Sequence, residues 1–250
     1  MKKRLDVLLV ERGLATSRTL AQALVMEGKV RVAGQVERKA SRQLADDVGL
    51  EVESPPRFVS RGGDKLEGAF ASFPEFDVAG KVCIDVGSST GGFTDCMLQH
   101  GAKRVMAVDV GTNQLAYRLR SDPRVWCREN YNARYMKSAD LPEVPEVAVT
   151  DVSFISLELI LPPIVDVLSP GGLIVALIKP QFEVGRGNAP GGLVRDEALR
   201  LEARDRIVGF ARENLGLELL GLEKSPVPGK EMGNIEYLSF WRKPPARDGI

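Results

Sequence analysis

Four charged residues lie next to apolar segments or in turns, where a charge is costly unless it has a function. They are the first candidates for catalytic residues. Asp151 follows the apolar run 147–149, and Lys179 follows the six apolar residues 173–178. We expect both at the carboxyl ends of strands, the edge where open α/β sheets bind ligands. A partly desolvated Lys179 needs an acid nearby, which Asp151 or Glu236 could supply. Lys65, in Ser-Arg-Gly-Gly-Asp-Lys, precedes the first strand and could fold back over the site. The catalytic candidates are therefore Lys65, Asp151, Lys179 and Glu236.

A glycine-rich loop follows a buried strand and predicts a cofactor site. The strand 82–86 runs into Gly-Ser-Ser-Thr-Gly-Gly-Phe at 87–93, where glycines let the backbone turn sharply and approach a ligand closely. The pattern Asp-x-Gly-x-x-x-Gly-Gly differs from the dinucleotide pattern Gly-x-Gly-x-x-Gly. We interpret it as the loop that contacts the amino-acid half of S-adenosylmethionine, with Asp85 holding the ammonium. A tight turn of some other α/β fold is the alternative reading of the glycines.

Two later strand ends complete the predicted cofactor site. Asp109 ends the second strand, where an acid can accept both ribose hydroxyls; its alternative role is the N-cap of a helix before Thr112. Glu129 and Asn130 follow a third short strand, where the adenine amine would be read. The predicted cofactor contacts are Asp85, Gly87, Ser88, Ser89, Gly91, Gly92, Phe93, Asp109 and Asn130.

Strands alternating with helices must position these residues. The predicted strands are 82–86, 105–110, 147–149 and 173–178, and the predicted helices are 92–100, 156–168 and 196–215. Such alternation implies a mostly parallel sheet covered on both faces. The last two strands, around 217–222 and 235–241, are joined by a Pro/Gly loop, which makes the final strand antiparallel. The predicted fold class is α/β, a Rossmann-like methyltransferase sheet.

The first 53 residues have the pattern of a separate small domain. Two short amphipathic helices, a hairpin around Ala33-Gly34 and a further strand predict a compact αα-β unit. The paired prolines of 54–56 mark a linker, since proline continues neither a helix nor a central strand. We therefore predict two domains, 1–58 for RNA binding with its linker and 59–250 for methyl transfer.

Charge is unevenly spread along the chain, although the net charge is zero. Residues 1–45 carry ten Lys/Arg against four Asp/Glu, and the rest of the chain has the opposite excess. A basic piece on an acidic body predicts a nucleic-acid partner, and a solvated charged surface is the alternative. The candidates for phosphate contacts are Arg4, Arg18, Lys29, Arg31 and Arg38.

What the sequence lacks disfavours several classes of protein. Three widely spaced cysteines and the single His100 offer no metal-ligand spacing, so we expect no metal and reduced thiols. No apolar stretch approaches the roughly 20 residues that span a bilayer. Charges interrupt the N-terminus, so we expect no secretory signal, no stable membrane association and a cytoplasmic location. The glycine-rich segment 184–192 either orders over substrate or is a mere connection.

These motifs together resemble a known family. The four candidates, in this order around Asp-Val-Gly-Ser-Ser-Thr-Gly-Gly-Phe, resemble the Lys-Asp-Lys-Glu tetrad of the FtsJ-like ribose 2′-O-methyltransferases. The N-terminal unit resembles the small RNA-binding domain first seen in a small-subunit ribosomal protein. With Lys-Pro-Gln-Phe-Glu-Val-Gly, nearly the whole chain is similar to the TlyA family of hemolysin-named rRNA methyltransferases. The loop departs from the FtsJ form in Ser-Ser-Thr for Ala-Ala-Pro and in Phe93 for Trp.

The resemblance implies methyl transfer from S-adenosylmethionine to a cytidine ribose 2′-hydroxyl of ribosomal RNA within ribosomal subunits. Lys179 would touch the hydroxyl, either neutral as a base or charged and steering the oxygen's lone pair toward the methyl group. Lys65 would position the ribose or its phosphate. Much of the rate would come from alignment, which needs no metal. The oligomeric state is not predicted.

Three alternatives stay open. Base methylation is disfavoured because Asp151-Val-Ser-Phe lacks the prolines of exocyclic-amine enzymes, and Cys83, Cys96 and Cys127 lie away from this segment. An RNA-binding protein with a non-catalytic methyltransferase fold would have no need for an intact tetrad. A membrane-lysing activity, which the family's hemolysin name suggests, would be expected to show a spanning segment or a long basic amphipathic helix.

Overall fold

The chain folds into two compact units, Met1–Pro56 and Arg57–Ile250. The computed structural model describes residues 2–53, 56–185, 187–229 and 233–246. Each unit has its own apolar core: one in the smaller unit, and two in the larger unit, on the two faces of its sheet.

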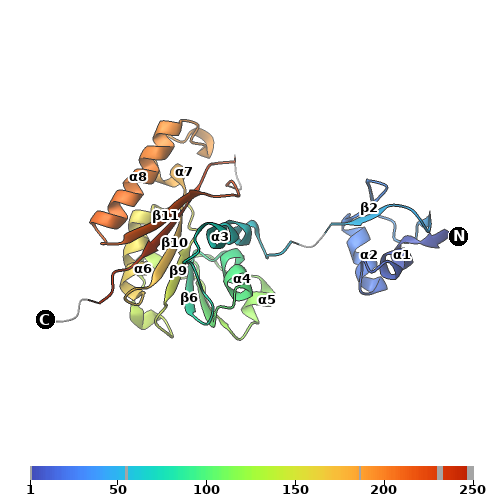
Figure 1. Ribbon diagram of the computed structural model, residues 1–250, viewed down its shortest axis with the longest axis horizontal. Helices are drawn as coiled ribbons and strands as arrows, with labels where there is room; N and C mark the ends of the chain where they lie inside the picture. The colour runs from blue at the N-terminus through green and yellow to red at the C-terminus, as the bar shows by residue number, and fades with distance from the viewer. Residues whose placement is uncertain (1, 54–55, 186, 230–232, 247–250) are drawn as a thin grey trace. The chain divides into compact units, whose positions relative to one another are not determined.

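The larger unit is built on a seven-stranded sheet (Figure 1). Its strands are β6 (Val82–Val86), β7 (Arg104–Val108), β8 (Val125–Arg128), β9 (Val147–Thr150), β10 (Leu173–Ile178), β11 (Glu218–Lys224) and β12 (Tyr237–Arg242). They lie in the order β11-β12-β10-β9-β6-β7-β8. β12 runs antiparallel to β10 and β11, whereas the other pairs are parallel. The predicted Rossmann-like methyltransferase sheet with an antiparallel last strand is confirmed.

Helices cover both faces of this sheet, which explains why its central strands are apolar along their whole length. One face packs against α3 (Arg61–Ser72), α4 (Gly92–Gln99) and α5 (Tyr117–Arg120), and the other against α6 (Leu161–Val167) and α8 (Glu197–Glu213). Successive side chains of a strand point to opposite faces. In β6, Cys83 therefore joins the core of α3 and α4, and Ile84 joins the core of α6 and α8.

Two helices differ from the sequence pattern. The pattern does not predict α3, because Gly62 and Gly63 disfavour an isolated helix. Tertiary packing stabilises it: a Cβ on Gly63 would lie 2.1 Å from the ring of Phe58. The helix predicted over 156–168 starts only at Leu161, because Pro162-Pro163 fits the first helical turn and no later one.

Shorter helical turns complete the larger unit. They are η1 (Ala133–Tyr135), η2 (Ser138–Asp140), η3 (Leu157–Leu159), α7 (Pro180–Glu183) and η4 (Pro190–Gly192). Of these, α7 follows β10 directly, so it begins at the same edge of the sheet as Lys179.

The smaller unit packs two helices against short strands. Its elements are β1 (Lys2–Arg4), α1 (Leu5–Glu11), α2 (Arg18–Met26), β2 (Val30–Val32), β3 (Gln35–Glu37), β4 (Gln43–Ala45) and β5 (Leu50–Val52). β2 pairs with β3 and β5, and β1 pairs with β4. The Ser17 side chain caps α2 by accepting from the Leu20 N–H. Ala33 and Gly34, at φ 51° and 79°, form the predicted hairpin turn.

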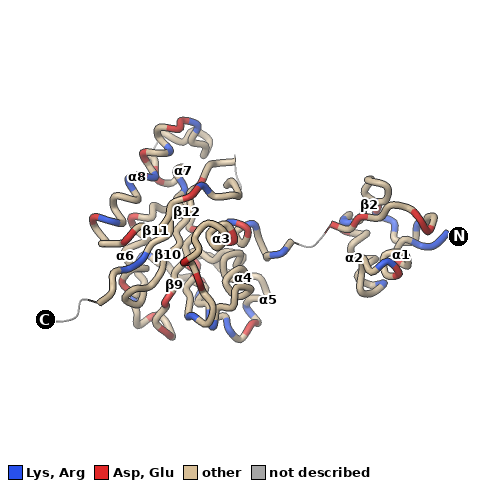
Figure 2. The backbone as a smooth tube through the Cα atoms, in the orientation of Figure 1, with Lys and Arg blue, Asp and Glu red and all other residues tan. Residues whose placement is uncertain are grey.

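Counted over the whole smaller unit, charge is nearly balanced (Figure 2). Residues 1–56 carry ten Lys/Arg and eight Asp/Glu, because four acids follow the basic stretch. The net charge of the whole smaller unit is therefore weaker evidence for RNA binding than the count over residues 1–45. The positions of individual arginines and acids are better evidence.

Candidate active site

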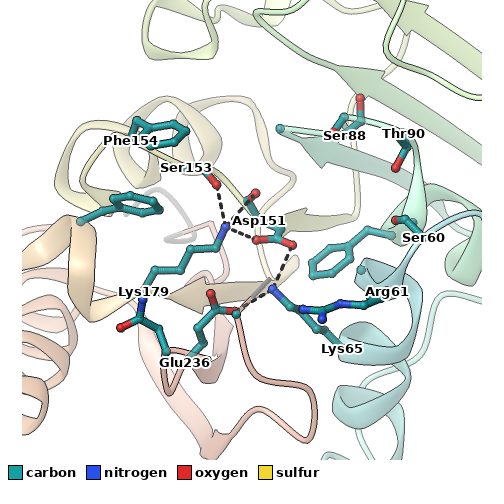
Figure 3. A pocket seen from close by; sticks show the side chains of 18 of the residues that line it. Ser60, Arg61, Lys65, Ser88, Thr90, Asp151, Ser153, Phe154, Lys179 and Glu236 are labelled. Atoms are coloured by element: carbon teal, nitrogen blue, oxygen red, sulfur yellow. Dashed lines mark hydrogen bonds and ion pairs between the residues drawn. The ribbon is translucent and has the colours of Figure 1, made fainter. Parts of the chain in front are cut away.

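A pocket of about 570 Å³ opens at the carboxyl edge of the large sheet. Its volume is within the range of small-molecule sites. Residues from α3, from the loops after β6, β9 and β10, and from just before β12 line it (Figure 3). This is the edge where open α/β sheets bind ligands.

The four catalytic candidates meet in this pocket as one connected set of ion pairs. Lys179 Nζ lies 2.5 Å from Asp151 Oδ1, and Lys65 Nζ lies 2.6 Å from Glu236 Oε2. Lys65 Nζ is also 3.7 Å from Asp151 Oδ2, which joins the two pairs (Figure 3). Both lysines are 7% exposed and Glu236 is 2% exposed. Two cations and two anions balance, as buried charges must.

The structure selects between two ion-pair partners that the sequence left open for Lys179. Asp151 and Glu236 were both possible partners for Lys179, and the fold assigns Asp151 to Lys179 and Glu236 to Lys65. Asp151 and Lys179 follow the parallel strands β9 and β10. Glu236 precedes β12, and because β12 is antiparallel its first residues lie at the same edge. Lys65 comes from α3, which packs over α4 at this edge.

Three residues that sequence reasoning did not select surround Lys179. Its Nζ donates to the Ser153 hydroxyl at 2.9 Å and lies 5.8 Å from the centre of the Phe182 ring. Phe154 stacks at an angle on Phe182, with ring centres 5.0 Å apart. Phe154 is 85% exposed and has a φ of 64°, an arrangement that is costly for an aromatic residue. An aromatic residue three positions after Asp151 was the available sequence signal.

Asp85 lies in the part of the pocket formed by the loop after β6, and its surroundings show whether that part fits the predicted cofactor. Its carboxyl group is fully buried, and Oδ2 accepts from the Thr94 N–H at 2.9 Å and the Thr94 hydroxyl at 2.6 Å. Oδ1 has no hydrogen-bond partner among the residues that the structure describes. Burial raises the pKa of Asp85 to about 7. A buried, unpartnered carboxylate oxygen beside the pocket is a suitable acceptor for the ammonium of S-adenosylmethionine.

The glycine loop around Asp85 has the geometry that the sequence predicts. Gly87 has a φ of 82°, and a Cβ there would lie 2.9 Å from Val152 Cγ1. Any larger residue would push the loop after β6 away from the loop after β9. The predicted contacts that line the pocket are Asp85, Gly87, Ser88, Ser89, Gly92 and Phe93.

The other predicted cofactor contacts lie outside this lining. Asp109 accepts from the Gly111 N–H and the Ser89 N–H, both at 2.7 Å, so it ties the first loop to the second. No helix starts at Thr112; α5 begins at Tyr117, so the helix-cap alternative for Asp109 is wrong. Asn130 accepts from the Thr112 hydroxyl at 2.7 Å. Contacts from any of the nine predicted residues to a cofactor stay predictions.

Glu129 has a structural task that the sequence did not indicate. Its carboxylate accepts from three successive backbone N–H groups, those of residues 113–115, and pairs with Arg120. The Arg120 guanidinium and these N–H groups lower the pKa of Glu129 to about 2. Glu129 therefore holds the loop after β7 in place.

The five candidate phosphate contacts of the smaller unit have different surroundings. Arg4 and Arg18 both pair with Asp6. Lys29 pairs with Glu27 at 2.6 Å, Arg31 donates to the Gly34 carbonyl at 3.2 Å, and Arg38 donates to the Met26 carbonyl at 3.3 Å. The first two share one acid, whereas the others lie near the β2–β3 hairpin.

The glycine-rich segment after β10 is held at its far end. The Asn234 side chain donates to the Gly192 carbonyl at 2.7 Å and accepts from the Val194 N–H at 3.2 Å. Gly192 and Asn234 both line the pocket. Residue 186 lies outside the described residues, and closure of this segment over substrate stays a prediction.

Two observations bear on metals and membranes. Glu67 of α3 lies beside Cys96 of α4 and His100, which caps α4 at its C-terminus, a juxtaposition that spacing along the chain does not reveal. Glu67 contacts His100 at 2.8 Å and Arg57 at 2.7 Å, so it already joins α3 to the end of α4 and to the segment before α3. In the parts of the chain that the structure covers, no helix has both the length and the apolarity to cross a membrane.

Known proteins match both units. Residues 58–243 match the family described as FtsJ-like methyltransferase, and residues 3–49 match the S4 domain. The chain is 49% identical to "Putative rRNA methyltransferase YqxC" of Bacillus subtilis over 240 residues, 95% of this chain and 84% of that protein. It is 44% identical to "16S/23S rRNA (cytidine-2'-O)-methyltransferase TlyA" of Mycobacterium tuberculosis over 244 residues, 96% and 90% of the two chains.

A solved structure agrees with these sequence matches. "Putative hemolysin from Streptococcus thermophilus" superposes with a TM-score of 0.74 at 44% identity, over 97% of this chain and 89% of that chain. A methyltransferase from Listeria monocytogenes, at 16% identity and a TM-score of 0.55, shares the fold of the larger unit. The chain therefore belongs to the TlyA family, whose members join an S4 domain to an FtsJ-like methyltransferase domain.

Proposed function

We propose that this protein transfers a methyl group from S-adenosylmethionine to the ribose 2′-hydroxyl of a cytidine in ribosomal RNA. The observation that carries the proposal is the pair of the buried Lys179 with the partly buried Asp151, which shares its pocket with the unpartnered oxygen of Asp85. A cofactor ammonium at Asp85 and a ribose at Lys179 would occupy two ends of the same pocket. The name of the Mycobacterium tuberculosis relative supports cytidine and ribosomal RNA as the substrate.

We infer that Lys179 orients the hydroxyl as an ammonium. It contacts the Asp151 carboxylate and donates to Ser153. An ammonium has three N–H donors, so a further one could donate to the ribose oxygen. S-adenosylmethionine supplies an activated methyl group on its sulfonium. Methylation of the ribose oxygen would require the hydroxyl proton to leave. The Asp151 carboxylate, which lies next to Lys179, could accept it.

Lys65 and Glu236 complete the site. Lys65 bridges Glu236 and Asp151, so it holds the Asp151 carboxylate in place and presents a cation to a ribose or phosphate. Phe154, exposed beside Lys179, offers a surface on which a base can stack, a common mode of RNA recognition. Most of the rate then comes from alignment and fixed charges.

We propose that residues 1–58 bind RNA and residues 59–250 carry out methyl transfer. The S4 match and the exposed arginines support the first assignment. Ribosomal subunits are the expected partner, which would place the protein in the cytoplasm with ribosomes.

The proposed function is tested by mapping the methylated atom. Purified protein is incubated with labelled cofactor and separate small and large ribosomal subunits, and the labelled RNA is digested to nucleosides. We expect label on the ribose of a cytidine. Label on a base with an unmodified ribose would contradict the mechanism, and no label on either subunit or on free ribosomal RNA would contradict the substrate.

A further inference from the structure

A buried acid in the smaller unit connects two of its candidate RNA-binding arginines. Asp6 lies in the first turn of α1, and its side chain is 0% exposed. Oδ1 accepts from Arg4 Nε at 3.0 Å, and Oδ2 accepts from Arg4 Nη2 at 3.0 Å, Arg18 Nη2 at 3.1 Å and Gln22 Nε2 at 2.8 Å. The bond from Arg4 and the other donors hold the pKa of Asp6 well below its usual range. One carboxylate therefore joins the end of β1, the start of α1 and the start of α2.

The two arginines are held at one end and exposed at the other. Their side chains are 40% and 57% exposed, although the acid that they share is fully buried. A guanidinium has five N–H donors. Asp6 takes two from Arg4 and one from Arg18, so both keep donors that Asp6 does not use. Two cations around one anion also leave a surplus positive charge.

We infer that Asp6 is a positioning residue that holds Arg4 and Arg18 together as a clamp for one RNA phosphate. This inference rests on the proposed function, since it needs the smaller unit to bind RNA. A guanidinium with a fixed plane loses less side-chain freedom when it binds a phosphate. A residue that only joined α1 to α2 would not need arginines whose outer ends are exposed.

Asp6→Asn tests the clamp, because the change in net charge and the loss of the clamp predict opposite changes in RNA affinity. The substitution makes the domain more positive by one charge, which by itself tightens RNA binding. The clamp predicts weaker binding, because the amide no longer holds two guanidinium groups. Asp47→Asn is the matched control, since Asp47 is exposed in the turn before β5 and the charge change is the same.

The full-length variants are titrated with purified ribosomal RNA at several KCl concentrations. We expect Asp6→Asn to raise the Kd about five- to tenfold and to lower the slope of log affinity against log salt by about one phosphate contact. Asp47→Asn should bind as tightly as the unmodified protein or slightly more tightly. Binding by Asp6→Asn that equals or exceeds binding by Asp47→Asn overturns the clamp.

A second measurement leaves Asp6 in place, in case Asp6→Asn unfolds the domain. Arg4→Ala, Arg18→Ala and the double variant change half-exposed side chains. If both arginines hold one phosphate, each single variant and the double variant should all lose about one phosphate contact of salt slope. Losses that add to two contacts would show independent arginines and overturn the clamp.

Failure of the clamp is distinguishable from failure of the proposed function. If the unmodified protein neither binds nor methylates ribosomal RNA, the proposed function fails and the clamp with it. If the protein binds RNA and Arg4→Ala weakens binding, but Asp6→Asn behaves like its control, only the clamp is wrong.

Discussion

The two units of this protein each contain a network of lysines or arginines and acids, and the two networks differ in charge balance and exposure. In the larger unit, two lysines and two acids balance, and both lysines are 7% exposed. In the smaller unit, Arg4 and Arg18 surround the single buried acid Asp6 and keep a surplus charge at the surface. A balanced buried network sets the positions of reacting groups. An unbalanced exposed network attracts a polyanion.

This difference implies different responses to mutation and to salt. Loss of Lys179 from the buried network should change the rate of methyl transfer much more than it changes RNA affinity. Loss of a group in the exposed network should change RNA affinity and its salt dependence. Variants of both networks and of the cofactor site should show this contrast, with effects that decrease from Lys179 to Lys29.

Lys179→Ala should have the largest effect. Removal of the group that orients the ribose hydroxyl should lower the rate of methyl transfer by about 10²–10⁴-fold, measured as label transferred to ribosomal subunits. Affinity for S-adenosylmethionine, measured by calorimetry, should stay normal. The control is Lys103→Ala, an exposed lysine before β7. Undiminished methyl transfer by Lys179→Ala would contradict the catalytic assignment.

The protonation of Asp85 should make cofactor affinity depend on pH. Burial raises its pKa to about 7 in the folded protein. The ammonium of the cofactor binds the ionised carboxylate and therefore competes with a proton. Affinity should fall about tenfold per pH unit below pH 7 and level off above it. Asp85→Asn should bind the cofactor weakly at every pH. A pH-independent affinity in the unmodified protein would show that the ammonium binds elsewhere.

The same group makes a prediction for stability without cofactor. Because the folded-state pKa lies above the unfolded value near 3.8, the folded state binds the extra proton between these values. The free energy of unfolding should therefore decrease as pH rises from about 4 to about 7. In Asp85→Asn this contribution should be missing, which chemical denaturation at three pH values would reveal.

Phe154→Ala should have an intermediate effect on the RNA substrate. A base that stacks on an aromatic side chain gains about 1–3 kcal/mol, so methyl transfer under limiting RNA should fall about tenfold. Folding should not change, because the side chain is 85% exposed. Tyr117→Ala removes an aromatic that is 84% exposed elsewhere in the same unit. Equal effects from the two variants would argue against a specific stacking role.

Lys29→Ala should have the smallest effect. Lys29 pairs with the exposed Glu27, so part of its charge is already compensated. We expect less than about a threefold loss of RNA affinity, and a smaller change in salt slope than Arg18→Ala gives. A larger change than that of Arg18→Ala would show that the hairpin, and not the Asp6 region, makes the main phosphate contact.

Much of the fold could be predicted from the sequence because its signals are local. The strands β6 and β10 match the predicted ranges in full, since a run of apolar residues bounded by polar ones is visible along the chain. The loop 87–93 was predicted because its glycines follow a buried strand and permit a sharp turn, and Gly87 and Gly91 do have φ values of 82° and 93°. The helix α3 was not predicted, because its first turn contains two glycines and depends on packing against Phe58 and α4.

The sequence by itself determined the types of the four charged candidates, their order and their positions beside strands. Only the tertiary structure decided that Lys179 pairs with Asp151 and Lys65 with Glu236, that Phe154 points outward, and that Asp6 joins two arginines. The physical reason is that pairing depends on which segments the sheet order and the helices bring within 3–4 Å. Lys65 and Glu236, which are 171 positions apart, meet in this way. Their separation along the chain does not predict this contact.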